Sequence, residues 1–420
     1  NLTCLISFSD LTSDARFLLK GEYMRNAVIV DSVRTGLAKS FRGGFNNTRA
    51  DNMTSHIVNA LLERNPEVDP SMVEDIILGC GNPEGAQGHN IARNVAVLSN
   101  LPIQTGGVTI NRYCSSGLNS IAMAATQIQS GFYDCIIAGG VESISTSQGH
   151  TNMHMYVNDK LAEEVPGIYH AMGTTAECVA DRYNVTREAQ DEYALSSQQR
   201  CAAAQDAGYY DDEIIPMDTK MILKNKETGA EKEVDVTVDR DDCNRPETTL
   251  EGLSSLNPVF NPESGSVTAG NSSQLSDGAS VTLIMSEEKA NELGLKPLAY
   301  FRGFTTVGCQ PDEMGIGPVF SIPKLLDSAG LTVDDIDLWE LNEAFASQVV
   351  YIRDQLGLPS EKLNVNGGSI AIGHPFGMTG SRQVGHLARE LRRRNGKYGI
   401  VTMCVGGGMG ATGLFESIPE

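Results

Sequence analysis

Short apolar runs alternate along the chain with segments in which apolar residues recur every three or four positions. The periodic segments at residues 54–63 and 116–131 predict helices. Alternating strands and helices are typical of an α/β protein, and continuous apolar strands favour a buried, mostly parallel sheet. Strands of this kind are predicted at four apolar runs, residues 28–30, 75–79, 107–110 and 135–139.

The pattern changes between residues 147 and 274. A long helix is predicted over residues 186–207, and glycine and proline interrupt the acidic segment 209–251 that follows it. After residue 275 a strand, a helix and a new α/β series follow. Residues 147–274 are therefore interpreted as an inserted loop domain.

The new series repeats the order of the first. Residues 336–340 form an apolar run before a polar loop and a helix, as residues 75–79 do. The run at residues 399–404 resembles the strand before Cys114. We infer an internal duplication. It gives two similar α/β halves around the insertion, an N-terminal half (24–146 and 275–296) and a C-terminal half (297–420).

Residues 1–23 fit neither half. The apolar run at residues 2–8 is too short for a secretory signal. Met24 stands directly before the first predicted strand, so we expect it to be the natural start and residues 1–23 to be an N-terminal extension that is not native. No apolar run reaches ~18 residues, so no transmembrane helix is expected and the cytoplasm is the expected compartment.

The charge limits the classes of ligand. Lys and Arg number 32 and Asp and Glu number 53, which gives a formal net charge of −21. Such a surface repels phosphate, so nucleic-acid binding is not expected. An anionic ligand would need a local pocket that cations or backbone amides line.

The nine cysteines are scattered, and the two that are closest in sequence are Cys114 and Cys135. This spacing excludes a C-x-x-C zinc or redox motif and argues against a disulfide framework. Free thiols suit a reducing compartment. His150 and His154 lack an intervening Glu and a predicted helix, so we expect no metal site.

Cys114 lies in the motif NRYCSSG, where a predicted strand turns into a predicted helix. A helix N-terminus offers free N–H groups and positive partial charge, which favour a thiolate and can hold a developing oxyanion. Cys114 is therefore a candidate nucleophile. The alternative is a structural cysteine buried at a helix start.

A second motif, NGGSIAIGHPFGMTGS, places His374 in a glycine-rich loop that Pro375 stiffens. Such a loop favours a catalytic histidine over one that only packs. Cys404 ends a predicted strand and enters a glycine tract, as a second thiol in the setting of Cys114. Asn342 follows another strand and either binds a water or carbonyl or simply caps a helix.

Together these residues indicate acyl transfer through a thioester on cysteine. A second cysteine makes sense if a carbon acid or a thiol must exchange a proton after acylation.

The motifs, in their order along the chain, resemble those of the thiolase family from about Met24 to Glu416. They are NRYCSSGLNSI, AGGVESIS, MGTTAE, VTAGNSSQLSDGA, NEAFA, NGGSIAIGHPFGMTGSR and MCVGGGMG. The resemblance implies the thiolase fold, with two α/β halves in a five-layer αβαβα core and an inserted loop domain. It also implies homodimers or homotetramers, with a hydratase–dehydrogenase subunit as an optional partner.

The resemblance also implies roles for individual residues. Cys114 would accept the acyl group, and His374 would activate the Cys114 thiol. Cys404 would be the acid and base that moves a proton on the substrate α-carbon or on the incoming CoA thiol. Asn342, through a water, and His374 would form one oxyanion hole, and the amides of Cys114 and Gly406 would form the other. Coenzyme A would be a substrate, and no cofactor or metal is implied.

Binding residues are implied as well. Ser273 would lie along the pantetheine of coenzyme A, and Arg245 near its adenine. Met172, Met314 and Phe345 would line the acyl pocket.

The closest resemblance is to degradative 3-ketoacyl-CoA thiolases, which cleave a 3-ketoacyl-CoA with CoA to acetyl-CoA and a shortened acyl-CoA. Acetoacetyl-CoA specialists often carry His directly before the MGTTAE motif, where this chain has Ala171 and has His170 one residue earlier. The segment at residues 309–326 also resembles the degradative enzymes.

The alternatives are an acetoacetyl-CoA thiolase, a decarboxylating ketoacyl synthase and an inactive thiolase-like binding subunit. A ketoacyl synthase generally has His or Asn at the position of Cys404, and an inactive subunit would have lost one of Cys114, His374 and Cys404.

Overall fold

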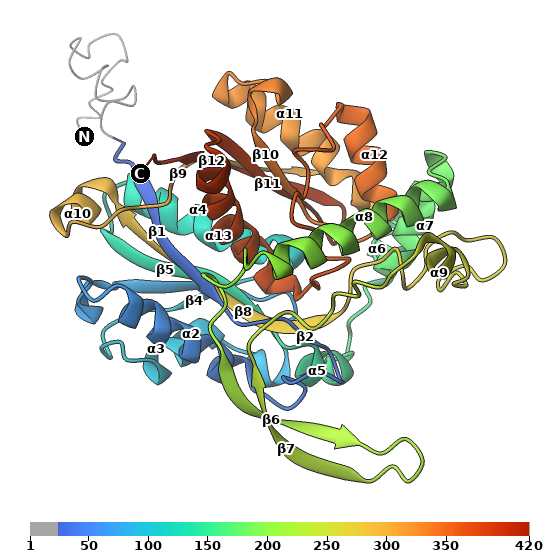
Figure 1. The fold of residues 1–420 in the computed structure, drawn as a ribbon, viewed down its shortest axis with the longest axis horizontal. Coiled ribbons are helices and arrows are strands. Elements are labelled where there is room, and N and C mark those ends of the chain that lie inside the picture. The colour runs from blue at the N-terminus through green and yellow to red at the C-terminus, as the bar shows by residue number, and fades with distance from the viewer. Residues whose placement is uncertain (1–23, 420) are drawn as a thin grey trace, which may run out of the picture.

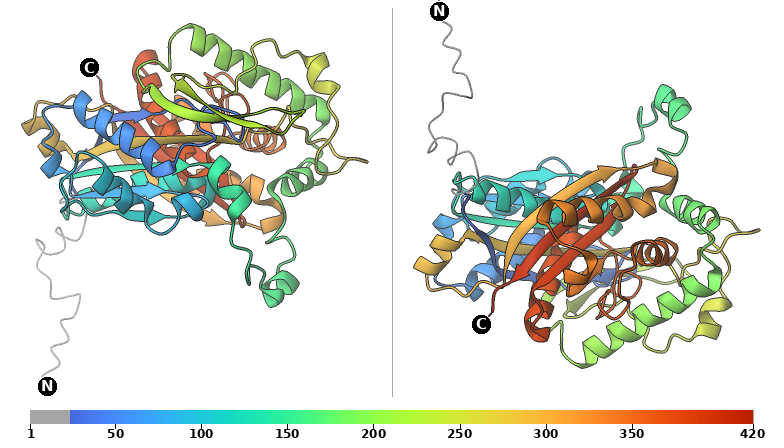
Figure 2. Two further views of the ribbon diagram at one scale, coloured as in Figure 1. Left: turned by 90° about the horizontal axis from the view of Figure 1, so that it is seen from below. Right: turned by 90° about the horizontal axis from the view of Figure 1, so that it is seen from above.

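The computed structural model describes residues 24–419, which form five layers in the order helices, sheet, helices, sheet, helices (Figure 1, Figure 2). This arrangement confirms the predicted α/β class and the two-half core. The predicted extension at residues 1–23 lies outside the described residues.

The sheet of the N-terminal half is mixed. Strand β3 (Asp75–Gly79) runs parallel to both neighbours, β4 (Val108–Ile110) and β5 (Cys135–Glu142). Strand β8 (Ser276–Ser286) pairs antiparallel with β5 on one side and with β1 (Ala27–Arg34) on the other. The order β4-β3-β5-β8-β1 places β4 at the edge of the sheet.

The C-terminal half repeats this pattern. Strand β10 (Leu338–Leu341) is parallel to β11 (Tyr398–Val405), and β12 (Met409–Ser417) is antiparallel to β11 and to β9 (Ala299–Gly308). The order β10-β11-β12-β9 therefore matches β3-β5-β8-β1, with the same relative directions. The predicted duplication is confirmed. Antiparallel pairing of β1 with β9 joins the two halves.

Two details of the sequence interpretation were wrong. The strands are not mostly parallel, because the last strand of each half returns antiparallel to its neighbours. In the C-terminal half, β12 follows β11 through the tight turn at residues 406–408, where Gly407 and Gly408 have positive φ. The run at residues 399–404 also matches β5 in the order of strands, not the strand before Cys114.

Three apolar clusters separate the layers. One lies outside the N-terminal sheet, one between the sheets and one outside the C-terminal sheet. Within residues 24–419 no helix is both long and apolar enough to cross a lipid bilayer. The layer helices are α2 (Ala50–Arg64), α3 (Ile91–Leu98), the central α4 (Ser116–Gln129) and α13 (Phe376–Arg394), and α11 (Gly317–Ala329) and α12 (Ala346–Leu356).

The chain between β5 and β8 runs along one side of the core and then returns (Figure 1, Figure 2). Its longest helix begins where the Thr186 side chain accepts a hydrogen bond from the amide of Ala189. The domain boundaries at 147 and 274 stay a prediction. The segment contains α5 (Ile144–Ser147), α6 (Asp159–Glu164), α7 (Met172–Arg182), α8 (Arg187–Asp206), the hairpin β6 (Met217–Lys224) and β7 (Glu231–Val238), and α9 (Leu250–Ser254).

The remaining elements are short. Strand β2 pairs with the beginning of β8, and helix α10 connects β8 to β9. Turns of 3₁₀ helix occur at several loop ends. These elements are β2 (Ala38–Lys39), α10 (Glu287–Glu292), η1 (Pro70–Met72), η2 (Gly85–Gln87), η3 (Tyr113–Ser115), η4 (Gln148–His150), η5 (Pro311–Ile316) and η6 (Val333–Asp335).

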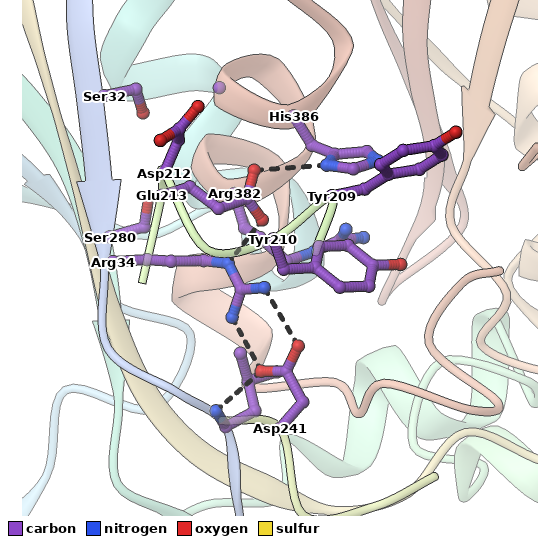
Figure 3. A network of polar contacts seen from close by, with 12 residues as sticks. Ser32, Arg34, Tyr209, Tyr210, Asp212, Glu213, Asp241, Ser280, Arg382 and His386 are labelled. Carbon is purple, nitrogen blue, oxygen red and sulfur yellow. Dashed lines mark hydrogen bonds and ion pairs between the residues drawn. The ribbon is translucent and has the colours of Figure 1, made fainter. Parts of the chain in front are cut away.

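A buried ionic network fastens the inserted segment to the core (Figure 3). Arg34 of β1 donates to Glu213 at 2.8 Å and to both oxygens of Asp241 at 2.6 and 2.9 Å. His386 of α13 contacts the other oxygen of Glu213 at 3.1 Å. Burial alone would raise the pKa of Glu213, but Arg34 and His386 lower it overall, so the carboxylate stays charged.

The central helices approach each other and the sheet so closely that only glycine fits at the contacts. A Cβ atom on Gly140 of β5 would lie 1.9 Å from the carbonyl oxygen of Gly377. A Cβ on Gly117 of α4 would lie 2.7 Å from the same oxygen, and one on Gly380 of α13 would lie 2.5 Å from the amide of Leu118. These contacts bring the first turns of α4 and α13 together.

We therefore expect Gly140→Ala to destabilise the fold by about 3 kcal/mol or more, because the added methyl meets backbone that cannot rotate away. The melting temperature by differential scanning fluorimetry measures this effect. Gly149→Ala is the matched control, because a Cβ there has no neighbour within 4 Å. An unchanged melting temperature for Gly140→Ala would contradict the close packing.

Candidate functional site

A cavity of about 640 Å³ lies at the first turns of the two central helices, a volume typical of small-molecule sites. Cys114 and His374 both face it. The inserted segment and the loop before β8 supply most of the opposite wall, including Met172 and Ser273. The structure thus brings together residues that are far apart in the sequence.

Cys114 lies in η3, two residues before α4 begins. The turn is held locally: Tyr113 has a φ of +44°, and its amide donates to Asn111 Oδ1 at 2.8 Å. Ser116 accepts from the amide of Arg112 at 2.8 Å and donates to the carbonyl of Tyr113 at 2.7 Å. The turn therefore presents the thiol at the floor of the cavity.

The backbone amides of Cys114 and Gly406 lie near the Cys114 sulfur, lower the pKa of its thiol and so favour the thiolate. Burial nevertheless raises the pKa of the thiol well above its usual value, and Cys404 and Glu142 raise it further. Backbone amides at this turn favour the thiolate, as expected for a helix start, but desolvation outweighs them. Cys114 needs a base.

His374 stands in the equivalent place in the second half, two residues before α13 begins. Its amide donates to the carbonyl of Gln274 and to Ser276 Oγ, both at 2.8 Å, which fixes the loop to the entry of β8. Burial lowers the pKa of the imidazole to about 3, and the Arg382 cation adds to this, so the ring is neutral.

The protonated nitrogen of His374 can be assigned from its partners. Nδ1 lies 2.7 Å from Thr379 Oγ1, and that hydroxyl donates to the carbonyl of Pro375 at 2.9 Å. Since the hydroxyl proton is used, Nδ1 must be the donor to Thr379, and Nε2 carries the free lone pair. Nε2 lies 3.3 Å from Asn342 Nδ2.

Asn342 follows β10 and is completely buried. Ser369 donates to Asn342 Oδ1 at 2.6 Å, which turns the NH₂ group toward His374. An N-cap role, the alternative for this residue, does not apply, because α12 begins at Ala346 and its N-cap residue is Phe345.

Cys404 lies near the end of β11 and is fully buried. Burial raises the pKa of this thiol to about 11, although the side chain of Gln348 donates to its sulfur at 2.8 Å and lowers the pKa somewhat. Cys404 is close enough to Cys114 to raise the pKa of that thiol. It packs in an apolar cluster with Met172, Met314 and Phe345.

The predicted binding residues line two adjoining cavities. Met172, Met314, Phe345 and Ser273 line the cavity that contains Cys114. Arg245 lines a second cavity of about 250 Å³, and Ala269 and Gln274 line both cavities. Gly406 stands at the start of the turn after β11, beside the ring of Tyr113.

Comparison with known proteins agrees with this geometry. The model for "Thiolase, N-terminal domain" matches residues 27–288, and that for "Thiolase, C-terminal domain" matches residues 295–417.

The chain belongs to the thiolase family.

Relatives and solved structures cover nearly all of this thiolase. It is 47% identical to the 3-ketoacyl-CoA thiolase of Bacillus subtilis, over 94% of the chain and all of that protein. It is 45% identical to the peroxisomal 3-ketoacyl-CoA thiolase 1 of Arabidopsis thaliana, over 94% of the chain and 88% of that protein.

Two solved structures share the fold. One is the dimeric peroxisomal thiolase of Saccharomyces cerevisiae, with a TM-score of 0.85 and 36% identity over 96% of this chain and all of that one. The other is the acetyl-CoA acetyltransferase of Bacillus anthracis, with a TM-score of 0.82 and 38% identity over 94% of this chain and all of that one.

The structure adds thiolase residues that the sequence did not single out. Lys39 and Arg42 line the cavity. The positive charges of Arg42 and Arg245 both repel that of Lys39. Burial lowers the pKa of Lys39, and the two arginines lower it further, so these three cations lie close together. Sequence analysis missed Lys39 and Arg42 because they lie some 200 residues before Arg245.

The bond between His374 and Thr379 leads to a test. Thr379→Val keeps the shape of the side chain but removes the acceptor for Nδ1–H, so the imidazole loses its fixed tautomer. We expect kcat to fall about tenfold or more with little change in melting temperature. Thr379→Ser is the matched control and should retain most of the activity. Equal kcat values for Thr379→Val and the unmodified protein would contradict this role.

Proposed function

We propose that the protein cleaves 3-ketoacyl-CoA with CoA to give acetyl-CoA and a shortened acyl-CoA, through an acyl group on Cys114. The observation that carries the proposal is that Cys114 and His374 line one cavity, with Cys404 and the backbone amide of Gly406 close to the Cys114 sulfur. The 3-ketoacyl-CoA thiolase name of its close relatives supports the same reaction.

In the first half of the reaction, His374 Nε2 takes the proton of the Cys114 thiol while the sulfur attacks the 3-keto carbon. The amides of Cys114 and Gly406, which both act on the Cys114 sulfur, would hold the oxyanion that forms there. The bond between carbons 2 and 3 then breaks, and its electron pair goes to acetyl-CoA as an enolate. Protonated Nε2 and Asn342, through a water, would hold the enolate oxygen.

Cys404 then gives its proton to carbon 2 of the enolate, which releases acetyl-CoA. Its pKa of about 11 keeps it a thiol at neutral pH, ready to act as an acid. In the second half, the resulting thiolate takes the proton of an incoming CoA thiol. The CoA sulfur attacks the acyl group on Cys114, and the C–S bond to Cys114 breaks. The Cys114 thiolate that leaves takes back the proton held on His374 Nε2.

The two adjoining cavities also suit CoA. We propose that the pantetheine passes Ser273 and that the cations Lys39, Arg42 and Arg245 contact the phosphates and adenine end. In a protein of net charge −21, this local cluster provides the attraction that an anionic substrate needs.

We further propose that the protein acts as a homodimer or homotetramer in the cytoplasm. The yeast structure is described as dimeric. Association with a hydratase–dehydrogenase subunit would supply the ketoacyl substrate directly.

The second candidate is acetoacetyl-CoA thiolase activity, because a similar structure is an acetyl-CoA acetyltransferase. Ala171 favours the broader reaction. Its small side chain lines the cavity next to Met172 and leaves room for a longer acyl group.

The covalent step predicts an acyl adduct on Cys114 after mixing with acetyl-CoA or a 3-ketoacyl-CoA, detected by peptide mass spectrometry. Cys404→Ala should still form some adduct but lose turnover by at least about 100-fold. Adducts only on other residues, or full turnover of Cys404→Ala, would overturn the assigned roles. Inactive protein with no adduct would favour the binding-subunit alternative.

Chain length separates the two enzymatic candidates. We expect kcat/KM for thiolysis to stay high for 3-ketoacyl chains longer than four carbons, because Ala171 leaves space in the cavity. A series of 3-ketoacyl-CoA substrates in a spectrophotometric assay measures this dependence. A single maximum at acetoacetyl-CoA would instead identify the short-chain specialist.

A further inference from the structure

Among residues 24–419, the side chain of Gln348 is the one that donates a hydrogen bond to the Cys404 sulfur. Gln348 is the third residue of α12 and, like Cys404, is completely buried. Its Nε2 donates to Cys404 Sγ at 2.8 Å. No sequence pattern singles out this glutamine, because it lies 56 positions before Cys404.

The surroundings of Cys404 give its charged form little other support. The thiol packs against an apolar cluster that includes Ala176, Met314 and Phe345. The thiols of Cys114 and Cys309 lie close enough to Cys404 to interact with it electrostatically. Neither brings a positive charge, so the support for a thiolate comes from the Gln348 amide and the backbone amide of Cys404.

Gly315 lies on the other side of the Gln348 side chain. A Cβ on Gly315 would lie 3.0 Å from the Cβ of Gln348 and 3.2 Å from its Oε1, so glycine leaves just enough room there. Oε1 is buried and has no hydrogen-bond partner among the described residues. The Nε2–H group of the amide therefore donates to the Cys404 sulfur, while its Oε1 is an acceptor that no described residue uses.

We propose that Gln348 is the positioning residue for Cys404, stabilising its thiolate by a charge-assisted hydrogen bond while the proton is away. This inference rests on the acid–base role proposed above for Cys404. When Cys404 protonates carbon 2, the S–H bond breaks, its electrons stay on sulfur, and the Nε2–H group donates to the negative sulfur. When the CoA thiol gives up its proton, the S–H bond forms again.

A neutral amide suits a group that must alternate between two protonation states. A lysine or arginine would hold Cys404 as a thiolate and make it a poor acid. An apolar residue would leave the thiolate unsupported in an apolar cluster. An amide favours the thiolate without fixing it, and rotation about its last bond would offer Oε1 to the S–H form.

Gln348→Met tests the proposal, because it keeps the length of the side chain and removes the donor. A hydrogen bond to a charged group is worth about one to two pKa units, so the pKa of Cys404 should rise by that amount. In a Cys114→Ser background, which removes the other reactive thiol, carbamidomethylation of Cys404 by iodoacetamide at pH 8 should slow about tenfold or more.

Peptide mass spectrometry follows this reaction and separates the two explanations. A role in packing alone predicts that Gln348→Met loosens the site and makes alkylation of Cys404 faster. A role in stabilising the thiolate predicts slower alkylation. Alkylation at the parent rate or faster would overturn the proposal.

Gln348→Glu gives an independent readout in the pH profile of turnover. The protonated carboxyl can donate to the sulfur as the amide does, whereas the carboxylate repels a thiolate. We therefore expect kcat relative to the unmodified protein to fall as pH rises from about 6 to 8.5. A parallel profile would count against the proposal, and this variant keeps it testable if Gln348→Met fails to fold.

Gln383→Met is the matched control. Gln383 is buried in α13 and also has an Oε1 without a partner among the described residues, but it forms no hydrogen bond with Cys404 there. It should keep the parent alkylation rate and pH profile. Full turnover of Cys404→Ala would remove the acid–base role of Cys404 on which this inference rests, and a parent protein with neither thiolysis nor a Cys114 adduct would remove the proposed function itself. Loss of turnover in Cys404→Ala with an unchanged Gln348→Met would remove only the role of Gln348.

Discussion

The site depends on one packing constraint, the backbone contact between the first turns of α4 and α13. Glycines at 117, 140, 377 and 380 let the two helices and β5 approach to distances that any side chain would prevent. Cys114 and His374 each stand two residues before one of these helices, so the contact that closes the core also sets their separation. Stability and chemistry are therefore coupled through the same few atoms.

Burial sets the protonation of the site. Desolvation raises the pKa values of Cys114 and Cys404 and lowers that of His374, so all three are neutral before substrate binds. Neutral groups avoid the cost of isolated buried charge. Charge arises only during the reaction, where the amides of Cys114 and Gly406 and the side chain of Gln348 already point at the atoms that receive it.

Much of the fold was accessible from the sequence, because apolar periodicity marks strands and helices and the two halves repeat one order. The direction of the strands could not be predicted, because the tight turn at residues 406–408 and the long insertion determine it. Motifs located Cys114, His374, Cys404 and Asn342. Periodicity could not locate Thr379, Lys39 or Gln348, because their partners are fixed by tertiary packing. The raised pKa of Cys114 was not predicted, because burial cannot be read from a helix start.

The matching positions of Cys114 and His374 bear on how such a site could arise. Each stands two residues before the central helix of its own half, and the two halves share one strand order. Two identical subunits facing each other in this way would present two thiols or two imidazoles. Joining the copies in one chain allows each to mutate alone, so a nucleophile and its base can diverge from a single ancestral position.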